Sequence, residues 1–498
     1  MLTMSDDHGT ISVLKLVTGR LTSADFGTLR QAQLQAQAQG RGALLVDLSA
    51  VRRITRSGLA ALVEFQSEMP REVVLGFFGA RKTVRREFDR CAVSRLLDLF
   101  ETREQALQTP AFRAKRLSGV KAVLLVAGTG SRMAPMSHQT PKPLLDLLGR
   151  PVLDHVMAHL SQFGIRDFIL NPGHLGPQFH AHIQSSASRS VQFLNEGRYV
   201  GSDWHAEPMG SASTLLALQT RRMAFDDDFV VLCGDAVSDV DLADMMDTHR
   251  RTGAEVTIAV QQVAPEDVQK YGIIETDVSG RITGFVEKPT PEAARSHLAS
   301  TGIYIVNPRA LQRLSGGMGQ DIARHLMPAV LAAGGHMQVY DANFSWVDMG
   351  CGRDFYRTTS RGLRGLIPGV EPCGREIRRH VWAAAGAQVS PRAVIVGPCF
   401  IGADAVVEAG AKLEGPTAIG AGAYVEARTL VRRAIVMPKT AVRAGTWVDE
   451  MIVAGTWALD HRTANGDVRC QIPLEGVVPA AADPVSRSWP HRQMVGGM

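Results

Sequence analysis

A six-residue period between residues 384 and 460 constrains the fold more than any other feature of the sequence. Apolar residues recur at every sixth position: Val389, Ile395, Ile401, Val407, Leu413, Ile419, Val425, Val431 and Met437. A small residue lies four positions after each of the first seven: Ala393, Cys399, Ala405, Ala411, Thr417, Ala423 and Thr429. One apolar and one small inward position per six residues is typical of a left-handed parallel β-helix. The phase slips by one near Ala434, where Val436, Val442 and Val448 follow, so we expect a loop or irregular coil there.

The rest of the chain predicts two α/β regions and a tail. Residues 1–110 alternate strand and helix patterns, with strands at Ile11–Thr18, Ala43–Leu48 and Val73–Phe78 and helices at Ser23–Gln39, Gly58–Ser67 and Val84–Leu99. Residues 119–365 form a second α/β region, with strands at Lys121–Val126, Phe168–Asn171, Phe229–Cys233, Glu255–Val260, Ile303–Val306 and Ser345–Val347. The segment Gln108–Ser118 has no clean pattern and is expected to be a linker. The Pro-rich, polar tail 461–498 is expected to be irregular.

Composition excludes several classes of protein. The net charge of +5 is spread over the chain without blocks of like charge, which argues against a nucleic-acid partner. The longest apolar runs, such as Ala122–Ala127, are strand-sized and far shorter than a membrane span. The N-terminus has acids where a signal peptide has bases, and the six cysteines show no metal-binding spacing. We therefore expect a cytoplasmic protein that binds neither membranes nor nucleic acid.

A glycine-rich loop follows the first strand of the second region. Gly128 and Gly130 let the backbone turn tightly, so that its N–H groups can face a triphosphate. Arg132 can bind phosphate oxygens through a bidentate fork, and Lys142 in a Pro-Lys-Pro segment can neutralise a second phosphate. The spacing excludes both the P-loop and the dinucleotide-binding fingerprint. The loop therefore predicts a triphosphate site of another kind.

Two carboxylates follow apolar strands in the same region. Asp235 comes after Phe229–Cys233 and Gly234, and Asp348 comes after Trp346-Val347. Strand ends at the carboxyl edge of an open α/β sheet are where ligands bind, so these carboxylates are candidate ligands for Mg²⁺. Each could instead be an ordinary turn or helix-cap residue.

The second region resembles the sugar-phosphate nucleotidylyltransferases over residues 120–363. The resemblance rests on Ala127-Gly-Thr-Gly-Ser-Arg132 with Thr140-Pro-Lys-Pro-Leu144, Glu207-Pro-Met-Gly-Ser-Ala212, Val231-Leu-Cys-Gly-Asp235, Tyr271-Gly272, Phe285-Val-Glu-Lys-Pro289, Thr301-Gly-Ile-Tyr304 and Trp346-Val-Asp-Met-Gly350. It implies a Rossmann-like (GT-A-like) mixed sheet and an enzyme that makes an NDP-sugar and pyrophosphate from an NTP and a sugar 1-phosphate. With a β-helix behind it, the chain is most similar to the GDP-mannose pyrophosphorylase branch.

The resemblance also implies roles for individual residues. Arg132, Lys142 and Asp235 would be catalytic, and Asp235 and Asp348 would hold Mg²⁺. The substrates would contact Ala127, Gly128, Gly130, Ser131, Glu207, Gly210, Ser211, Gly234, Glu287, Lys288, Thr301 and Gly302. Glu287-Lys288 could instead be an exposed charged pair before a turn.

The identity of the base and of the sugar stays open. This chain has Ser213 and Thr301 where many relatives have Gly and Asn, and Cys351 where Thr is common. The leading interpretation is mannose-1-phosphate guanylyltransferase. The alternatives are a glucose-1-phosphate uridylyl-, thymidylyl- or adenylyltransferase, and a catalytically silent sensor of NDP-sugars.

Residues 1–110 resemble a STAS domain. The match rests on Leu44-Leu-Val-Asp-Leu-Ser49 and Ile54-Thr-Arg-Ser-Gly-Leu59. The resemblance implies an unidentified protein partner and a phosphorylation switch at Ser57, although Ser57 could simply cap a helix. The β-helix, whose ends and faces must be covered, predicts a homo-oligomer.

Overall fold

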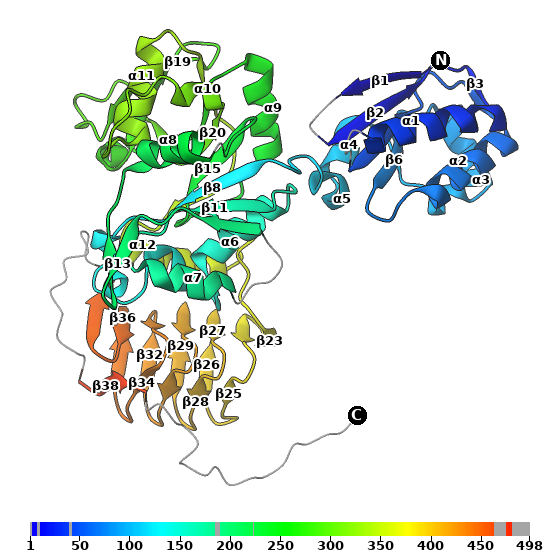
Figure 1. Ribbon diagram of the computed structural model, residues 1–498. Coiled ribbons are helices and arrows are strands. Elements are labelled where there is room, and N and C mark those ends of the chain that lie inside the picture. Colours follow the sequence, from blue (N-terminus) through cyan, green and yellow to red (C-terminus); the bar gives the residue numbers. More distant parts are fainter. Residues whose placement is uncertain are drawn as a thin grey trace. The chain divides into compact units, whose positions relative to one another are not determined.

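The computed structural model describes residues 2–6, 10–38, 42–184, 190–222, 224–462 and 475–480 (Figure 1). By contacts the chain divides into two compact units. The first comprises residues 1–128, 156–234 and 238–346, and the second comprises residues 129–155, 235–237 and 347–498. Most of the expected irregular tail, 461–498, lies outside the described residues.

The N-terminal part of the first unit is a small α/β layer fold. Its five-stranded sheet has the order β1-β2-β4-β6-β7, in which β1 is antiparallel to β2 and the other neighbours are parallel. The strands are β1 (Leu2–Asp6), β2 (Ile11–Leu16), β4 (Ala43–Asp47), β6 (Val74–Phe78) and β7 (Leu99–Phe100). The helices are α1 (Phe26–Ala38), α2 (Arg56–Glu68), α3 (Lys82–Arg90), α4 (Arg103–Gln108) and α5 (Pro110–Arg113), and a short pair joins β3 (Arg20–Leu21) to β5 (Arg53–Ile54).

Two expectations for this part are wrong in detail. The helix expected over Val84–Leu99 ends at Arg90, because Ala92 takes a left-handed conformation with φ 55° and the chain then turns into the edge strand β7. The segment Gln108–Ser118 is not an unstructured linker. It contains α5, and Phe112 is buried in a cluster with residues of β2 and β4. A periodic pattern of apolar residues cannot distinguish a continuing helix from a helix followed by a sheet edge.

A mixed sheet dominates the remainder of the first unit. The strand order is β12-β11-β8-β15-β20-β17-β21, and only β20 is antiparallel to its two neighbours. The strands are β8 (Lys121–Leu125), β11 (Asp167–Leu170), β12 (Ser190–Phe193), β15 (Phe229–Cys233), β17 (Val256–Gln262), β20 (Leu298–Val306) and β21 (Met337–Tyr340). A hairpin of β18 (Gly272–Thr276) and β19 (Ile282–Glu287) adds to β20. This sheet confirms the expected α/β class.

The helices and loops around this sheet place its motifs. The main helices are α6 (Val152–Ser161), α7 (Gly176–Gln184), α8 (Ser211–Arg222), α9 (Leu242–Thr252), α10 (Pro308–Leu311) and α11 (Met327–Ala332), and a separate hairpin is formed by β13 (Gly197–Val200) and β14 (Asp203–Ala206). Strands β8 and β15 are parallel neighbours, and Gly234 N donates to Leu125 O at 3.0 Å where both end. The glycine-rich loop and Gly234-Asp235 therefore leave the sheet at the same carboxyl edge.

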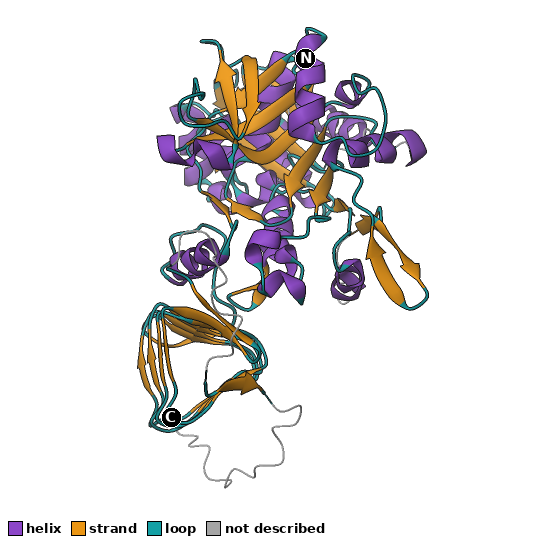
Figure 2. Cartoon of the chain, turned by 90° about the vertical axis from the view of Figure 1, so that its left-hand side faces the viewer, coloured by secondary structure: helices purple, strands orange, loops and turns teal. Residues whose placement is uncertain are grey.

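The second unit contains a three-sided parallel β-helix (Figure 2). One side is formed by β24 (Val381–Ala383), β27 (Cys399–Ile401), β30 (Thr417–Ile419), β33 (Ile435–Val436) and β36 (Met451–Ala454). The second is formed by β25 (Gln388–Val389), β28 (Val406–Val407), β31 (Tyr424–Val425) and β34 (Thr440–Val442), and the third by β26 (Val394–Val396), β29 (Lys412–Glu414), β32 (Leu430–Arg432) and β35 (Trp447–Asp449). The predicted small positions, such as Ala405 and Ala411, are fully buried inside it.

The phase slip is a shortened corner and not an inserted loop. Strand pairs are eighteen residues apart up to Lys412↔Leu430, and the next pair, Ala418↔Ile435, is one residue closer. Earlier coils turn this corner with Gly397-Pro398 and Gly415-Pro416, whereas Arg433 alone replaces the two residues, at φ 46°. The coil thus continues without a break.

Antiparallel strands cover several edges of the β-helix. β23 (Arg375–Arg378) pairs with β24, β37 (Trp457–Asp460) pairs with β36, and β38 (Val477–Pro479) pairs with β34. Such strands reduce the exposed backbone N–H and C=O groups that could pair with another chain.

The outer surface of one side of the β-helix is part of a second hydrophobic core. Phe400, Ala418, Ile435 and Ile452 point outward from successive coils, yet each is at most 6% exposed. They pack in one cluster with Phe355 and Leu363 of helix α12 (Gly352–Leu363). The same cluster contains residues of the second unit near the Pro-Lys-Pro segment and before α12: Met133, Met136, Leu145, Leu147 and Met349. This side of the β-helix therefore supports the loops that carry the predicted phosphate and metal residues.

Candidate active site

Three predicted residues of the second unit meet at one point. Lys142 Nζ lies 2.7 Å from Asp235 Oδ2 and 3.3 Å from Asp348 Oδ1. The lysine side chain is 9% exposed, and each carboxylate side chain is 24% exposed. Lys142 begins a short 3₁₀ turn after Pro141, and Asp348 ends strand β22 (Trp346–Asp348). Residues more than two hundred positions apart in the chain therefore share one polar contact.

The electrostatics keep this group charged. Burial alone would lower the pKa of Lys142, but the two neighbouring carboxylates outweigh the burial and raise its pKa above the usual value. The ammonium group thus sits where a small cation would balance the same two carboxylates.

The donor set fits a hard divalent cation. Two carboxylates converge on one position, and part of each remains open to solvent. Among the residues that the structure describes, no three His, Cys, Asp or Glu side chains are placed to hold a metal ion. Mg²⁺ is commonly bound by one or two carboxylates, with water and substrate phosphates in the other positions, so this arrangement matches its needs.

Arg132 lies near Asp348, one of the two carboxylates, and near Asp354. A Cβ placed on Gly350 would lie 3.4 Å from Arg132 Nη1, 3.5 Å from Asp348 Oδ2 and 3.2 Å from Asp354 Oδ2. Gly350 therefore occupies a narrow space between the guanidinium and two carboxylates. The Arg132 side chain itself is exposed, on a 3₁₀ turn that spans Ser131–Met133.

The two loop glycines differ in their structural role. Gly130 has φ 61°, a left-handed conformation that favours glycine, and its missing Cβ would meet Lys142 and Ser137 at 3.4 Å. Gly128 has no atom within 4 Å of the position of its missing Cβ. The neighbouring Ala127 accepts a hydrogen bond from His174 N at 3.2 Å, which anchors the start of the loop. Gly130 is required for the turn, whereas Gly128 leaves open space.

The residues expected near the nucleotide in the first unit already have partners. Glu207 is exposed and pairs with Arg198 at 2.7 Å. Gly210 has φ 90°, and a Cβ there would lie 2.4 Å from Gln320 O. Ser211 Oγ accepts from Ile322 N at 2.9 Å at the start of α8. The close approach at Gly210 and the bond of Ser211 hold the start of α8 against residues 319–322.

Glu287 and Lys288 lie at the end of β19. Glu287 is partly buried. A Cβ on Gly272 would lie 2.4 Å from Phe285 Cζ and 2.9 Å from Glu287 Oε2, so Gly272 makes room for both side chains. Lys288 has φ 51°, which is uncommon for a residue other than glycine. Its Nζ is 3.5 Å from Glu287 Oε1, and its side chain is half exposed. Such backbone strain is often found at ligand sites.

The Thr301 side chain forms a hydrogen bond to the backbone, whereas Gly302 is distinguished by its backbone conformation. Thr301 is buried, and its Oγ1 donates to Ala259 O at 2.8 Å across a register shift between β17 and β20. Its hydroxyl group is therefore engaged with the backbone. Gly302 has φ 75°, and a Cβ there would approach Cys233 Sγ to 3.2 Å.

Sequence reasoning missed a buried carboxylate. Glu196 is 2% exposed; its Oε1 accepts from Asn171 Nδ2 at 2.8 Å and from Thr214 Oγ1, and its Oε2 accepts from Met209 N at 2.8 Å. Asn171 Oδ1 in turn accepts from Val126 N at 2.7 Å. This network joins the start of the glycine-rich loop to the segment before α8. No periodic or motif signal marks Glu196, because its partners come from three distant segments.

Ser57 lies in the first turn of α2. Thr55 caps this helix, since its Oγ1 accepts from Gly58 N at 3.0 Å, and Ser57 Oγ is 3.0 Å from the same Thr55 Oγ1. Ser57 is exposed and is not the capping residue.

Comparisons with known proteins agree with this geometry. The nucleotidyl transferase family model matches residues 121–363, and the STAS domain model matches residues 5–106. A UTP–glucose-1-phosphate uridylyltransferase of Synechocystis is 32% identical over 353 residues, which cover 70% of this chain and 91% of that protein.

Two further relatives are mannose-1-phosphate guanylyltransferases. The protein of Mycobacterium tuberculosis is 30% identical, over 58% of this chain and 76% of its own length. The catalytic subunit beta of Drosophila melanogaster is 28% identical, over 76% of this chain and 98% of its own length. Within the described residues, no helix is both long and apolar enough to cross a membrane. The gathered lysine and carboxylates, the family match and these relatives together show that the chain belongs to the sugar-phosphate nucleotidyltransferase family and carries an N-terminal STAS domain.

Proposed function

We propose that this protein transfers a nucleotidyl group from an NTP to a sugar 1-phosphate and releases pyrophosphate, with GTP and mannose 1-phosphate as the leading substrates. The observation that carries the proposal is the contact of Lys142 with Asp235 and Asp348, beside Arg132. Two carboxylates for a metal ion and two cations for a triphosphate are the groups that this reaction needs. The guanylyltransferase relatives favour GTP.

Glucose 1-phosphate and UTP form the second candidate pair. The Synechocystis uridylyltransferase matches a longer part of this chain than the mycobacterial guanylyltransferase does. An assay of pyrophosphate release over a grid of four NTPs and several sugar 1-phosphates separates the two candidates. The pair with the highest kcat/KM identifies the substrates, and no release with any pair would contradict the proposal and favour a silent sensor.

Enzymes of this family typically use a divalent metal ion. We propose Mg²⁺, held by Asp235 and Asp348. When bound, Mg²⁺ supplies charge stabilisation at the α-phosphate. The phosphate of the sugar substrate is largely ionised at pH 7, so it can act as the nucleophile without a general base.

The remaining work of the site is positioning and charge neutralisation. Arg132 and Lys142 bind the triphosphate oxygens, and the backbone at Gly128, Gly130 and Ser131 approaches the phosphates where no side chain intervenes. Lys142 exchanges its contact with the two carboxylates for a contact with the substrate. Glu287 and Lys288 at the end of β19 bind the sugar and its phosphate.

The substrate sites in the first unit act largely through their backbone. Gly210, Ser211 and Gly234 approach the nucleotide, and Gly302 lines the sugar site with the backbone of Thr301, whose hydroxyl is engaged elsewhere. The backbones of Ala127 and Glu207 complete the set as contacts on the nucleotide side. Because NTPs are made in the cytoplasm, we expect the enzyme to act there.

We further propose that residues 1–110 act as a separate STAS module for a protein partner. Ser57 is exposed at the start of α2, so a kinase could reach it, and a phosphate there would add charge beside the helix N-terminus. A pull-down with Ser57→Asp and wild-type baits tests this switch. Identical partners for both baits would contradict it.

Self-association is proposed through the third side of the β-helix. Val394, Val396 and Trp447 on this side are 51%, 54% and 74% exposed, respectively. Val394 and Val396 lie on the first strand of this side and Trp447 on the last, in line with Lys412 and Leu430, so each would offer exposed apolar surface to a second copy at a separate point. Trp447→Lys should reduce the mass measured by light scattering, and a monomeric wild-type protein would contradict the proposal. Deleting the whole β-helix is a poor test, because its first side, which carries Phe400 and Ile452, belongs to the core of the second unit.

A further inference from the structure

Helix α12 connects the metal-binding segment to the β-helix within the second unit. It begins at Gly352, shortly after Asp348, and ends at Leu363. Gly352 lies so close to strand β37 that a Cβ on it would be 2.3 Å from Leu459 Cδ2. A side chain at position 352 would therefore require the Leu459 side chain to move.

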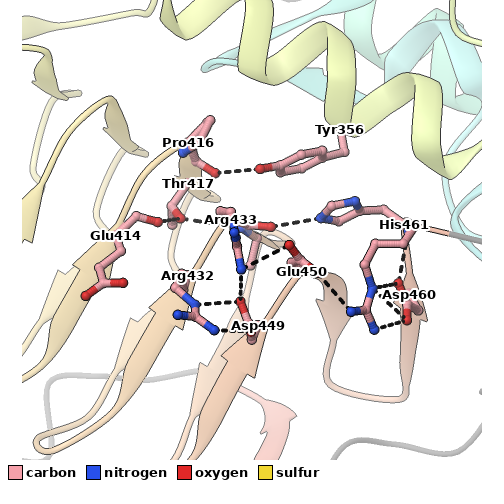
Figure 3. A network of polar contacts seen from close by, with 12 residues as sticks. Tyr356, Glu414, Pro416, Thr417, Arg432, Arg433, Asp449, Glu450, Asp460 and His461 are labelled. Carbon is pink, nitrogen blue, oxygen red and sulfur yellow. Dashed lines mark hydrogen bonds and ion pairs between the residues drawn. The ribbon is translucent and has the colours of Figure 1, made fainter.

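The aromatic side chain of Tyr356 fixes the next turn of α12. Its ring stacks on the imidazole of His461, with centroids 3.6 Å apart and planes 11° from parallel. Its hydroxyl group donates to Pro416 O at 3.2 Å, and His461 Nε2 lies 2.8 Å from Arg433 O (Figure 3). The contacts of Tyr356 and His461 thus reach two successive corners of the β-helix.

Charged pairs hold the residues on which this stack rests. Arg433 pairs with Glu450 at 3.0 Å, and Glu450 also pairs with Arg462 at 2.9 Å (Figure 3). Arg462 also pairs with Asp460 at 2.6 Å. These two residues flank His461 in the chain. Single exposed ion pairs contribute little, but a connected set restrains the backbone on both sides of the imidazole.

The segment between Asp348 and Tyr356 is packed along its length. Met349 is fully buried, and Phe355 is 1% exposed in the same cluster as Ile435 and Leu459 of the β-helix. Cys351 Sγ donates to Asp354 Oδ2 at 3.1 Å across the first turn of α12. A displacement of the Tyr356 end would therefore be passed to Asp348 through the first turn of α12 and the packed, non-helical residues Met349–Cys351 that precede it.

We propose that Tyr356 and His461 are positioning residues for the metal-binding carboxylate Asp348. Their stack holds α12 on the β-helix and so keeps Asp348 directed at the point that it shares with Asp235. The inference rests on the proposed function, because it assumes that these two carboxylates hold the metal ion. It gives the β-helix a role in catalysis beyond the assembly expected from the sequence.

The test measures Mn²⁺ binding by the full-length protein, with Mn²⁺ as a spectroscopic probe for Mg²⁺. Electron paramagnetic resonance reports the dissociation constant in the presence of a non-hydrolysable NTP analogue. Tyr356→Ala and His461→Ala should each weaken Mn²⁺ binding about tenfold or more, which is the usual effect of removing a residue that orients a ligand. The double variant should be no weaker than either single variant, because both changes remove the same stack.

Two matched controls separate positioning from general damage. Tyr356→Phe keeps the stack and loses only the bond to Pro416, so it should restore near-wild-type Mn²⁺ binding. Leu366→Ala changes an exposed apolar residue of the second unit to which no role is assigned, and it should have no effect. Circular dichroism confirms that each variant is folded, and His461→Ala carries the test if Tyr356→Ala does not fold.

The outcomes distinguish this inference from the function on which it rests. If Asp235→Asn leaves Mn²⁺ binding unchanged, the metal site itself is wrong and the inference fails with it. If Asp235→Asn abolishes binding while folded His461→Ala binds like the wild type, the metal site stands and the positioning role alone is overturned.

Discussion

The two units hold their candidate functional residues in opposite ways. In the second unit, buried Lys142 contacts Asp235 and Asp348, whose carboxylates are partly exposed. In the first unit, the side chains of Thr301 and Ser211 are bonded to backbone groups of neighbouring segments. Charged groups that only balance each other can exchange partners when a ligand arrives, whereas groups that complete the backbone hydrogen bonding cannot. Under the proposed function, the second unit supplies charge to the substrates, and these residues of the first unit supply shape.

The largest expected effect follows from removing either carboxylate. Asp235→Asn and Asp348→Asn should each lower kcat by about 10³-fold or more, because each removes a negative charge from the metal site at constant volume. Pyrophosphate release at saturating substrate measures the loss, and thermal unfolding should show that the fold is retained. A kcat near that of the wild type in either variant would mean that these carboxylates serve only to balance Lys142.

Removing either cationic side chain should lower kcat less than removing a carboxylate, and its effect on metal binding should differ. Lys142→Ala and Arg132→Ala should each lower kcat by about 10²-fold, as expected when a preorganised charge on a phosphoryl group is lost. Lys142→Ala should also leave metal binding intact or make it tighter, since Lys142 occupies the position between the carboxylates. Mn²⁺ titration beside steady-state kinetics tests both parts. Weaker Mn²⁺ binding would show that Lys142 organises the carboxylates.

Thr301 should affect stability more than turnover. Thr301→Val leaves Ala259 O without the donor that now lies 2.8 Å away, so the free energy of unfolding should fall by about 1–3 kcal/mol. The kcat should stay within a few-fold at a temperature where the protein is folded. Urea unfolding measures the first effect, and Thr301→Ser is the matched control that keeps the donor. A large rise in KM for the sugar 1-phosphate at unchanged stability would place the hydroxyl on the substrate.

Glu207 should give the smallest effect. Its pair with Arg198 is exposed, with the two side chains 53% and 68% accessible, so Glu207→Gln should change stability by less than about 1 kcal/mol. The KM for the NTP should change by less than about threefold, since an exposed pair of this kind is worth so little. Steady-state kinetics with the preferred NTP measures it. A tenfold rise in KM would show that Glu207 leaves Arg198 for the nucleotide, and the contrast between the two units would then weaken.

The sequence alone was sufficient for the features that depend on local repetition and on backbone constraints. The six-residue period predicted the interior of the β-helix, because alternation between inside and outside follows from strand geometry. Gly128 and Gly130 predicted a tight turn, and the structure shows the left-handed conformation at Gly130. The order of motifs singled out Lys142, Asp235 and Asp348, which the structure brings together. The single-residue deletion at Arg433 was visible as a phase slip, but the sequence did not reveal that a shortened corner absorbs it.

Only the tertiary structure decided which groups are free and which are engaged. Outward positions of the β-helix repeat look alike in sequence, yet Phe400 and Ile452 are buried in the core of the second unit, whereas Val394 and Trp447 are exposed. Likewise, the bond of Thr301 to Ala259 and the stack of Tyr356 on His461 join residues far apart in the chain. A local pattern determines the direction in which a side chain points, but its burial and its partners depend on which distant segment lies opposite it.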